Sequence, residues 1–428
     1  MNNRSKDREL KKIKDIFPLK HHQISMMYNI MNNQDFYYEK LTYLLKGEIC
    51  EKKFRNTWAM IVQLNDVLRS IYVWETDNIP LQIVFEEKEI PIFCFKSEEE
   101  YDLYYSSQYK IDVSKNAICV FLIRLNKATY KMIIYTHHIV MDGWSHANLL
   151  SQFVRAYLDE HDWADGVQPA SYKNYMKYYL MQCQDNKAYW LNYIASFSNT
   201  NAKIVHSTSK AFQYISYKLS LEDINALACK IGSMEFSFSD VIFSFWGILL
   251  QFFYNQKKII FGVTLSGRDR PDDSTKRLLG MLISTVPIYI DFSEKNDFFG
   301  LTQEIKEIKL QHILHQEYDI REINKNLFWN STVVIQNYPI TNKRREKINV
   351  ELIEHKYKNE MDISLGVRIL DNNVFFDYSY ASALFSSRDI MFLHECYKKL
   401  FNRIAKGYDV WGVKVNSMIS ILNNEEDI

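Results

Sequence analysis

The sequence predicts a mixed α/β protein built from two lobes. At 428 residues the chain is longer than one hydrophobic core usually organises, so two lobes of roughly 200 residues are expected. Segments with the apolar spacing of helices also alternate with short apolar runs typical of strands. We place the N-terminal lobe at residues 1–175 and the C-terminal lobe at residues 176–428.

In the N-terminal lobe, residues 117–125 and 130–136 predict a β-hairpin, and residues 144–158 have the apolar spacing of a helix. Earlier in the chain the pattern is less regular. There it predicts helices at 6–14, 23–30 and 54–70 and short strands at 71–74 and 81–85. Residues 172–197 return to a helical pattern, and the boundary between the lobes lies within them.

The C-terminal lobe alternates between the two patterns along its whole length. Asp371-Asn372-Asn373 supplies good turn chemistry for a hairpin between its last two strands. The predicted strands are 212–219, 259–265, 331–335, 363–370 and 374–380, and an apolar run covers 278–290. The predicted helices are 221–231, 239–256, 298–314 and 387–405.

Composition narrows the class of protein. Apolar residues make up 47% and aromatic residues 15%, which is a globular composition. Lys plus Arg (52) equals Asp plus Glu (52), so we expect neither nucleic acid nor an anionic membrane as a partner. The six cysteines are scattered without a CxxC pair, as in a reduced, cytoplasmic protein. We also expect no secretory signal and no membrane-spanning segment.

The stretch with the clearest chemical content is His137-His138-Ile139-Val140-Met141-Asp142-Gly143, between the hairpin and the helix. Side chains alternate along a strand, so one imidazole can face a cavity while the other faces the interior. Imidazole titrates near neutral pH and can take a proton from an attacking amine or hydroxyl. Asp142 can fold back beneath the histidines or cap the following helix, and both roles stay open.

Two other chemistries fit this stretch less well. Ser145 follows Gly143 but lacks the GxSxG elbow that exposes a serine nucleophile. The sequence has no HExxH, and no third ligand stands at zinc-binding spacing, so no metal is expected. Acyl transfer by positioning and proton handling, without a covalent enzyme intermediate, fits the residues better.

The HHIVMDGWS stretch resembles the HHxxxDG motif of the condensation domains of nonribosomal peptide synthetases. Further similarities follow in order along nearly the whole chain, and the ordered set is far more specific than HHxxxDG alone. They are Phe17-Pro18-Leu19 with Gln23 and Met26-Met27-Tyr28, Val67-Leu68-Arg69-Ser70, Leu81-Gln82-Ile83-Val84, Ser171-Tyr172-Lys173-Asn174-Tyr175, Tyr189-Trp190, Ser266-Gly267-Arg268 with residues 280–287, His315-Gln316-Glu317, Gln336-Asn337-Tyr338-Pro339 and Leu384-Phe385.

The resemblance implies two chloramphenicol-acetyltransferase-like lobes arranged as a V-shaped pseudo-dimer, with His138 in a tunnel at their interface. Donor and acceptor peptidyl carrier proteins would each present a thioester on phosphopantetheine, and the acceptor amine would attack the donor carbonyl to form an amide bond. The protein would need no cofactor of its own and would act in antibiotic or other secondary-metabolite biosynthesis. An adjoining adenylation domain and a monomeric state also agree with the resemblance.

The resemblance also assigns roles to residues. His138 would orient or deprotonate the amine, His137 would support the loop, and Gly143 would leave room for substrate. Asp142 would pair with an arginine, for which Arg69 and Arg268 are the candidates. The residues expected to line the substrate tunnel are Trp144, Ser145, Ser284 and Asn337.

The chain differs from the family pattern at three places outside the HHxxxDG core. Leu64-Asn65-Asp66 replaces Arg-His-Glu, Ser284 replaces a common Asn, and Asp319-Ile320 replaces Pro-Phe. Other activities within the superfamily therefore remain open. They are ester or amide formation with a soluble acceptor, epimerisation, and a non-catalytic platform that recruits tailoring enzymes.

Overall fold

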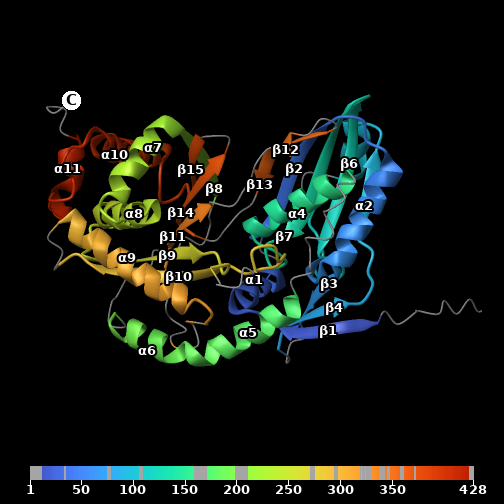
Figure 1. Ribbon diagram of the computed structural model, residues 1–428, viewed down its shortest axis with the longest axis horizontal. Coiled ribbons are helices and arrows are strands. Elements are labelled where there is room, and N and C mark those ends of the chain that lie inside the picture. The colour runs from blue at the N-terminus through green and yellow to red at the C-terminus, as the bar shows by residue number, and fades with distance from the viewer. Residues whose placement is uncertain are drawn as a thin grey trace, which may run out of the picture. The chain divides into compact units, whose positions relative to one another are not determined.

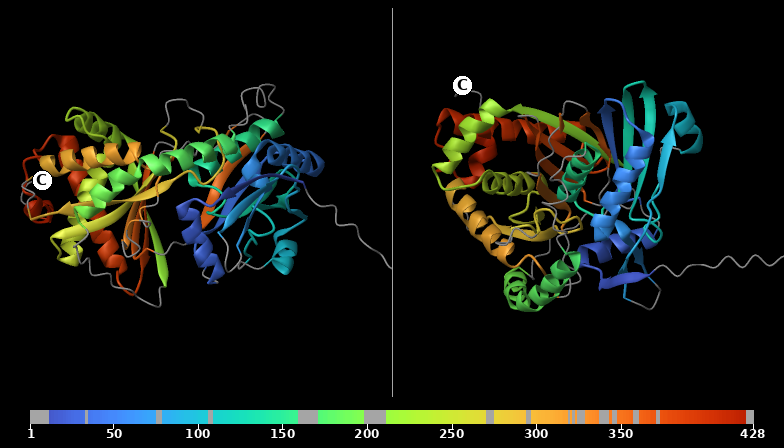
Figure 2. Two further views of the ribbon diagram at one scale, coloured as in Figure 1. Left: turned by 90° about the horizontal axis from the view of Figure 1, so that it is seen from below. Right: turned by 45° about the vertical axis from the view of Figure 1, so that its right-hand side comes forward.

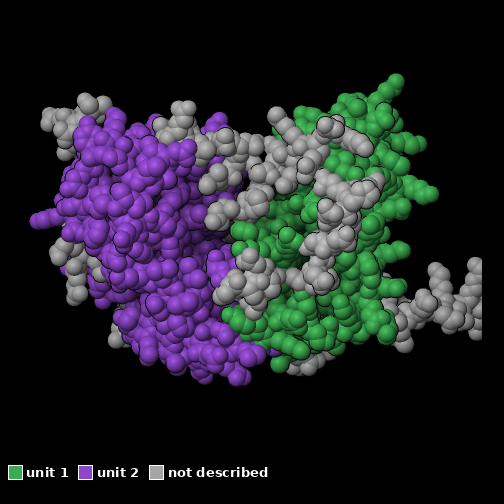
Figure 3. Space-filling model, in the orientation of Figure 1, with its two compact units in different colours: residues 1–178, 270–282, 342–359 green, residues 179–269, 283–341, 360–428 purple. Residues whose placement is uncertain are grey.

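The computed structural model confirms a mixed α/β fold whose chain divides into two compact units (Figures 1 and 3). Unit 1 contains residues 1–178, 270–282 and 342–359, and unit 2 contains the remainder. The first crossing between units therefore falls three residues beyond the predicted boundary at 175. The two contiguous lobes of the prediction omit the two later segments that belong to unit 1. The structure describes residues 12–32, 35–74, 79–105, 109–158, 171–197, 211–269, 275–293, 297–318, 320, 323, 329–336, 343–344, 348–356, 361–370 and 373–423.

Unit 1 is built on a six-stranded sheet in the order β12-β13-β2-β7-β6-β5. Its hairpin is the predicted one, β6 (Ile118–Asn126) and β7 (Thr129–His137). The other strands are β2 (Tyr38–Lys46), β5 (Ile92–Phe95), β12 (Lys343–Arg344) and β13 (Asn349–Lys356). Strand β13 pairs antiparallel with β2 and lies beside it in Figure 2 although some 300 residues separate them. The sequence prediction missed both of these strands.

Two helices pack together on this sheet, α2 (Glu51–Leu64) and α4 (Gly143–Tyr157) (Figure 1). Trp58 of α2 stacks on Phe153 of α4 with ring centroids 5.4 Å apart. Both rings are buried, so the two helices share one apolar core that fixes the start of α4 relative to the strands. Helix α3 (Glu98–Tyr104) contacts β5 and β6.

A smaller sheet of unit 1 has the order β1-β4-β3, with β1 (Ile13–Pro18), β3 (Ser70–Val73) and β4 (Leu81–Phe85). Ile13 and Lys14 are therefore strand, where a helix was predicted for 6–14, and the earlier residues lie outside the described part. The pairing of Ile13 with Phe85 explains the difference, since a partner strand overrides a weak local helical preference. Helix α1 (His21–Met31), the 3₁₀ helix η1 (Asp66–Arg69) and the first half of α5 (Tyr172–Asp185) complete unit 1.

Unit 2 contains a six-stranded sheet in the order β10-β9-β11-β14-β15-β8. The strands are β8 (Phe212–Ser220), β9 (Lys258–Leu265), β10 (Ser284–Asp291), β11 (Ser331–Gln336), β14 (Ile363–Leu370) and β15 (Asn373–Ala381). The helices are α6 (Lys187–Ala195), α7 (Leu221–Gly232), α8 (Phe238–Tyr254), α9 (Phe298–Leu314), α10 (Ser387–Lys406) and α11 (Met418–Asn423), with the 3₁₀ helix η3 (Val415–Ser417).

The core of unit 2 forms around α8, whose residues from Val241 to Leu250 are all buried. This segment is the most apolar helix predicted from the sequence, and the structure places it in the interior of its unit. None of the helices in the described part of the chain is long and apolar enough to cross a membrane.

Candidate functional site

The site forms where β7 ends and α4 begins, within unit 1. Strand β7 ends at His137, which pairs with Tyr38 of β2. The backbone amide of His138 then donates to Tyr37 O at 2.8 Å, and Val140 N donates to His137 O at 2.9 Å. These two bonds turn the chain sharply out of the sheet and present the His138 side chain at the turn.

His137 is fully buried. Its Nδ1 accepts a hydrogen bond from Ile139 N at 3.0 Å, so the proton of the neutral ring lies on Nε2. The ring of Tyr38 meets it edge-on with centroids 4.7 Å apart. Burial, with a further contribution from His138, lowers the pKa of His137 to about 3, so the ring is neutral at ordinary pH. It supports the turn from inside.

His138 is half-buried, in contrast to its neighbour. Its Nδ1 lies 2.9 Å from the carbonyl oxygen of Met141, and because a carbonyl only accepts, Nδ1 must donate. In the neutral ring Nε2 therefore carries a lone pair. A histidine held in this tautomer can accept a proton from a group that approaches Nε2.

Asp142 is the N-cap of α4, one of the two roles left open by the sequence. Its Oδ1 accepts from Ser145 N at 2.9 Å. Its Oδ2 accepts from Leu282 N at 2.9 Å, and its own amide donates to Gly280 O at 3.2 Å. The carboxylate is fully buried and thus joins the start of α4 to a segment from much later in the chain.

Ser145 strengthens the same junction. Its hydroxyl lies 2.9 Å from both Asp142 Oδ1 and Gly280 O, and it accepts from Gly280 N at 3.1 Å. The residue is fully buried in these contacts, and its role in lining a substrate tunnel remains a prediction. Trp144 is half-buried, and its indole Nε1 donates to Lys276 O at 2.9 Å. Gly143, the first residue of α4, is also half-buried.

Buried polar groups support the turn from α1 and its preceding residue. Gln23 Nε2 donates to Ile139 O at 2.8 Å. Lys20 Nζ donates to Leu282 O at 3.0 Å and contacts the hydroxyl of Tyr175 at 2.5 Å. The lysine side chain is almost completely buried. Gln23, from the first resembling motif, therefore holds the turn directly, whereas Lys20 holds the segment of Leu282 to which Asp142 also binds. No sequence pattern indicated these contacts.

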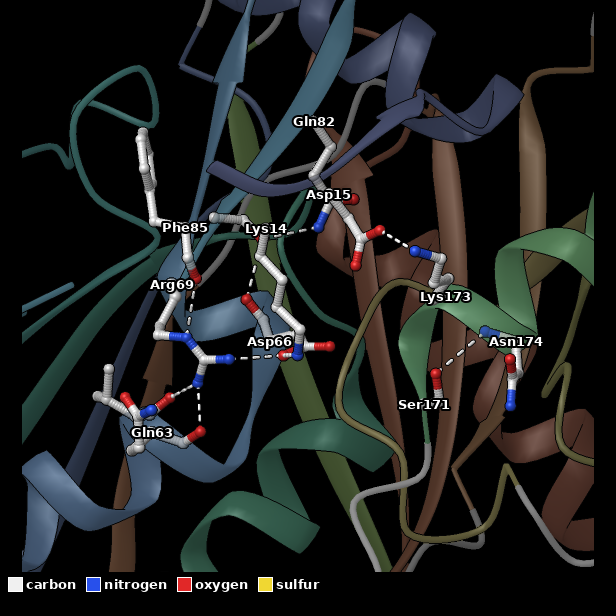
Figure 4. A network of polar contacts seen from close by, with 12 residues as sticks. Lys14, Asp15, Gln63, Asp66, Arg69, Gln82, Phe85, Ser171, Lys173 and Asn174 are labelled. Atoms are coloured by element: carbon white, nitrogen blue, oxygen red, sulfur yellow. Dashed lines mark hydrogen bonds and ion pairs between the residues drawn. The ribbon is translucent and has the colours of Figure 1, made fainter. Parts of the chain in front are cut away.

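Arg69, a predicted partner of Asp142, binds a different carboxylate (Figure 4). Its Nη2 lies 2.6 Å from Asp66 Oδ1, and its Nε donates to Phe85 O at 3.0 Å. Its Nη1 donates to the carbonyls of Val62 and Gln63. The planar guanidinium thus joins the end of α2, η1 and β4. Asp66 lies three residues before Arg69 in the same 3₁₀ helix. The guanidinium therefore pairs with this nearby carboxylate, whereas the sequence prediction named Asp142.

The other candidate residues belong to unit 2. Arg268 is buried after β9, and its Nη1 donates to Ser266 O at 3.1 Å. Its pairing with Asp142 remains a prediction. Ser284 is buried at the first position of β10, opposite Leu265. Asn337 lies outside the described residues.

Sequence reasoning missed a buried carboxylate, Glu39, that contacts two histidines. Glu39 of β2 contacts His146 of α4, with Oε2 and Nε2 2.8 Å apart, and His355 of β13, with Oε1 and Nε2 3.2 Å apart. The alternation of Leu41, Tyr43 and Leu45 could have revealed β2 and thereby the inward direction of Glu39. His355 gave no such local signal, because only the pairing of β13 with β2 brings it near Glu39.

The arrangement provides one partly accessible imidazole with a defined tautomer, held in a rigid turn. Such a group suits proton transfer or hydrogen bonding to a nucleophile. Among the described residues, no group of three or more His, Cys, Asp or Glu side chains is placed to hold a metal ion.

The family of this α/β protein with an HHxxxDG turn follows from comparison with known sequences. The model of the Condensation domain matches residues 13–418. The chain therefore belongs to the condensation domain family.

Its relatives include nonribosomal peptide synthetases. Tyrocidine synthase 2 of Brevibacillus parabrevis is 23% identical over 88% of this chain and 11% of the relative. Bacitracin synthase 3 of Bacillus licheniformis is 23% identical over 77% of this chain and 6% of the relative. The chain thus spans about a tenth or less of the length of these relatives.

Solved structures show the same fold. The condensation domain from Monacolin K polyketide synthase MokA has a TM-score of 0.75 at 11% identity, covering 94% of this chain and 100% of that chain. The X-domain from teicoplanin biosynthesis also has a TM-score of 0.75, at 13% identity, covering 93% of this chain and 96% of that chain. The predicted chloramphenicol-acetyltransferase-like α/β fold is confirmed.

Proposed function

We propose that this condensation domain forms an amide bond between a donor acyl or peptidyl thioester and an acceptor aminoacyl thioester. Both substrates would be carried on phosphopantetheine arms of carrier proteins, and the chain would need no cofactor of its own. The observation that carries the proposal is the His138 side chain, which donates through Nδ1 to Met141 O and so leaves Nε2 to accept a proton. Family membership supplies the substrate class.

The reaction needs one bond to form and one to break. The acceptor nitrogen attacks the donor carbonyl carbon, the new C–N bond forms, and the C–S bond of the donor thioester breaks. The amine loses a proton on the way, and the thiolate leaving group gains one. Nε2 of His138 is suited to take the first proton or to orient the amine before attack, because its ring is fixed on the opposite edge. The buried His137 and the Asp142 cap keep that ring in place.

The test loads separate carrier proteins with a donor acyl group and an acceptor amino acid and follows the condensed product by mass spectrometry. Wild type is expected to form the amide, and His138→Ala to lower the rate by about 10²-fold or more. Gln63→Ala is the matched control, because its side chain lies on α2, away from the turn. Equal product from wild type and His138→Ala would exclude a catalytic His138.

The alternative activities make different predictions in the same assay. A soluble-acceptor acyltransferase would use a free amine or alcohol but not a carrier-bound acceptor. An epimerase would invert a carrier-bound aminoacyl group without condensation, which chiral analysis detects. A non-catalytic platform would give no product in any arm.

A further inference from the structure

Glu39 is a buried carboxylate that contacts two histidines and belongs to none of the motifs found in the sequence. Its side chain is 3% exposed, that of His146 5% and that of His355 27%. An ionised carboxylate only accepts hydrogen bonds, so Nε2 of each ring donates to it. Glu39 therefore cross-links three elements of unit 1, namely β2, α4 and β13.

The carboxylate is ionised in the folded protein. Burial alone would raise its pKa, but electrostatic attraction to the rings of His146 and His138 and the hydrogen bonds from His146 and His355 outweigh burial and lower the pKa well below its ordinary value. A buried negative charge without such partners would be very costly, so the histidines are what allow it to exist.

The position of Glu39 connects this charge to the turn. Glu39 pairs with Thr136 across the antiparallel ladder, so the two side chains share one face of the sheet, opposite the face of His137. Two residues earlier, Tyr37 O accepts from His138 N at 2.8 Å. At the other end of the turn, His146 N donates to Asp142 O at 3.1 Å within the first turn of α4.

Residues 37–39 thus hold the turn of His138 at both ends. Tyr37, which directly precedes β2, binds the His138 backbone through its carbonyl, and Glu39 binds the first turn of α4 through His146. The backbone of Tyr37 has φ 67°, a conformation that an aromatic residue adopts only when its surroundings require it. The contacts of residues 37–39 with the turn therefore offset the backbone strain at Tyr37.

Other ionisable groups near Glu39 do not supply a competing charge at neutral pH. Tyr43, on the same face of β2, has a pKa raised by burial, and His137 has its pKa lowered to about 3, again mainly by burial. Both side chains are neutral. Glu354 of β13 lies next to His355 but faces Thr42 and Lys40 at the edge of the pairing, and it is partly exposed.

We propose that Glu39 is a positioning residue for proton transfer at His138. It fixes the α4 end of the turn through His146, and its negative charge stabilises the imidazolium that forms when His138 takes the amine proton. This inference rests on the proposed function of His138 as a proton acceptor.

The test compares wild type with Glu39→Gln and Glu39→Asp in the condensation assay between pH 5 and 9. Gln keeps the size of the side chain and loses the charge, so the plateau rate should fall about 10-fold and the acidic limb of the rate profile should move about one unit to lower pH. Asp keeps the charge with a shorter reach, so its plateau should fall while its acidic limb stays at the wild-type pH. Glu354→Gln is the matched control and should change neither the plateau rate nor the pH of the acidic limb.

Titration of the His138 ring by NMR provides a readout without turnover. In Glu39→Gln its midpoint should move in the same direction as the acidic limb, and in Glu354→Gln it should not move. An unmoved midpoint in folded Glu39→Gln overturns the proposal. If His138→Ala keeps wild-type turnover, the proposed function of His138 fails. The role of Glu39 in proton transfer then fails with it, even if the NMR titration shows that Glu39 and His138 are coupled. Circular dichroism of each variant shows that it is folded. An acidic limb that moves in folded Glu39→Asp, which keeps the charge, also overturns the proposal.

Discussion

Asp142 Oδ2 accepts a hydrogen bond from the backbone amide of Leu282 at 2.9 Å, although the two residues are 140 positions apart. The other oxygen of the same carboxylate caps α4 through Ser145 N. One side chain therefore performs a local task, starting a helix, and a long-range one, attaching the segment 275–282 to the start of that helix. The turn that carries His138 leads directly into this residue.

Asp142→Ala should lower the free energy of unfolding by about 2–4 kcal/mol. The change removes a helix cap, worth about 1 kcal/mol, and leaves the buried amide of Leu282 without its acceptor, which costs about 1–3 kcal/mol. Ser145→Ala should cost about 1 kcal/mol. Because the two side chains contact each other, the double variant should lose less than the sum by at least about 0.5 kcal/mol in urea denaturation.

Asp297→Ala is the control for the cap alone. Asp297 caps α9 by accepting from Gly300 N at 2.8 Å, without a second bond of the kind that Asp142 makes among the described contacts. Its removal should cost about 1 kcal/mol. Equal losses for Asp142→Ala and Asp297→Ala would mean that the bond to Leu282 contributes nothing.

Gly280→Ala should destabilise the same junction by about 2–3 kcal/mol. Gly280 has φ 154°, which residues with a Cβ rarely adopt, and an added Cβ would lie 2.8 Å from Tyr172 Cε2. Gly232→Ala is the control, because a Cβ there meets nothing within 4 Å, and its effect should stay within about 0.5 kcal/mol. A shift of the thermal midpoint only for Gly280→Ala is the expected result, and similar midpoints for both variants would contradict it.

Local patterns were enough to predict the elements that surround the turn. The strands β6 and β7 are short apolar runs separated by a turn, the helix α4 has apolar residues at a spacing of about 3.6 residues, and Asp142 stands at a normal capping position. Pairings between distant segments were not predictable in this way. The alternation of Leu41, Tyr43 and Leu45 indicates β2 locally, although the buried Glu39 interrupts it, whereas β13 finds its partner β2 only across the chain.

The same reason explains which site residues were found and which were not. His137, His138 and Asp142 are adjacent in sequence and could be read as one unit. Arg69 pairs with Asp66 in its own 3₁₀ helix, whereas the resemblance to the family predicted the more distant carboxylate of Asp142 as its partner. Sequence therefore predicts the centre of the candidate site, whereas the contacts that support its turn follow only from the fold.

Arg69→Lys should lower the free energy of unfolding by about 2 kcal/mol. Arg69 is 2% exposed, and its fork serves Asp66 and three carbonyl groups that a lysine ammonium cannot all reach. Arg55→Lys is the matched control, since Arg55 also binds a carboxylate, Glu51, and a carbonyl, that of Ile92, but is exposed. That change should stay within about 0.5 kcal/mol, and a larger loss for Arg55→Lys than for Arg69→Lys in urea denaturation would refute the argument.

His137 should make the stability of the protein fall as the pH decreases below neutral. Its pKa is lowered to about 3 in the folded chain, chiefly by burial, and is roughly 6.5 in the unfolded chain. Between these values the unfolded chain binds a proton that the folded chain does not, so the contribution of His137 is complete above about pH 6.5 and is lost as the pH falls toward 3.

From pH 7 to pH 5 this loss amounts to roughly 2 kcal/mol. His137→Asn removes the titrating ring and keeps an acceptor for Ile139 N. Between pH 7 and pH 5 its free energy of unfolding should therefore fall by about 2 kcal/mol less than that of wild type. Urea denaturation at pH 7 and pH 5 measures the difference. His394→Asn is a comparator of the same sign, because burial lowers the pKa of His394 to about 4. If His137→Asn retained the full pH dependence of wild type, the neutral, buried state of His137 would be wrong, and its support of the His138 turn would have to come from a charged ring.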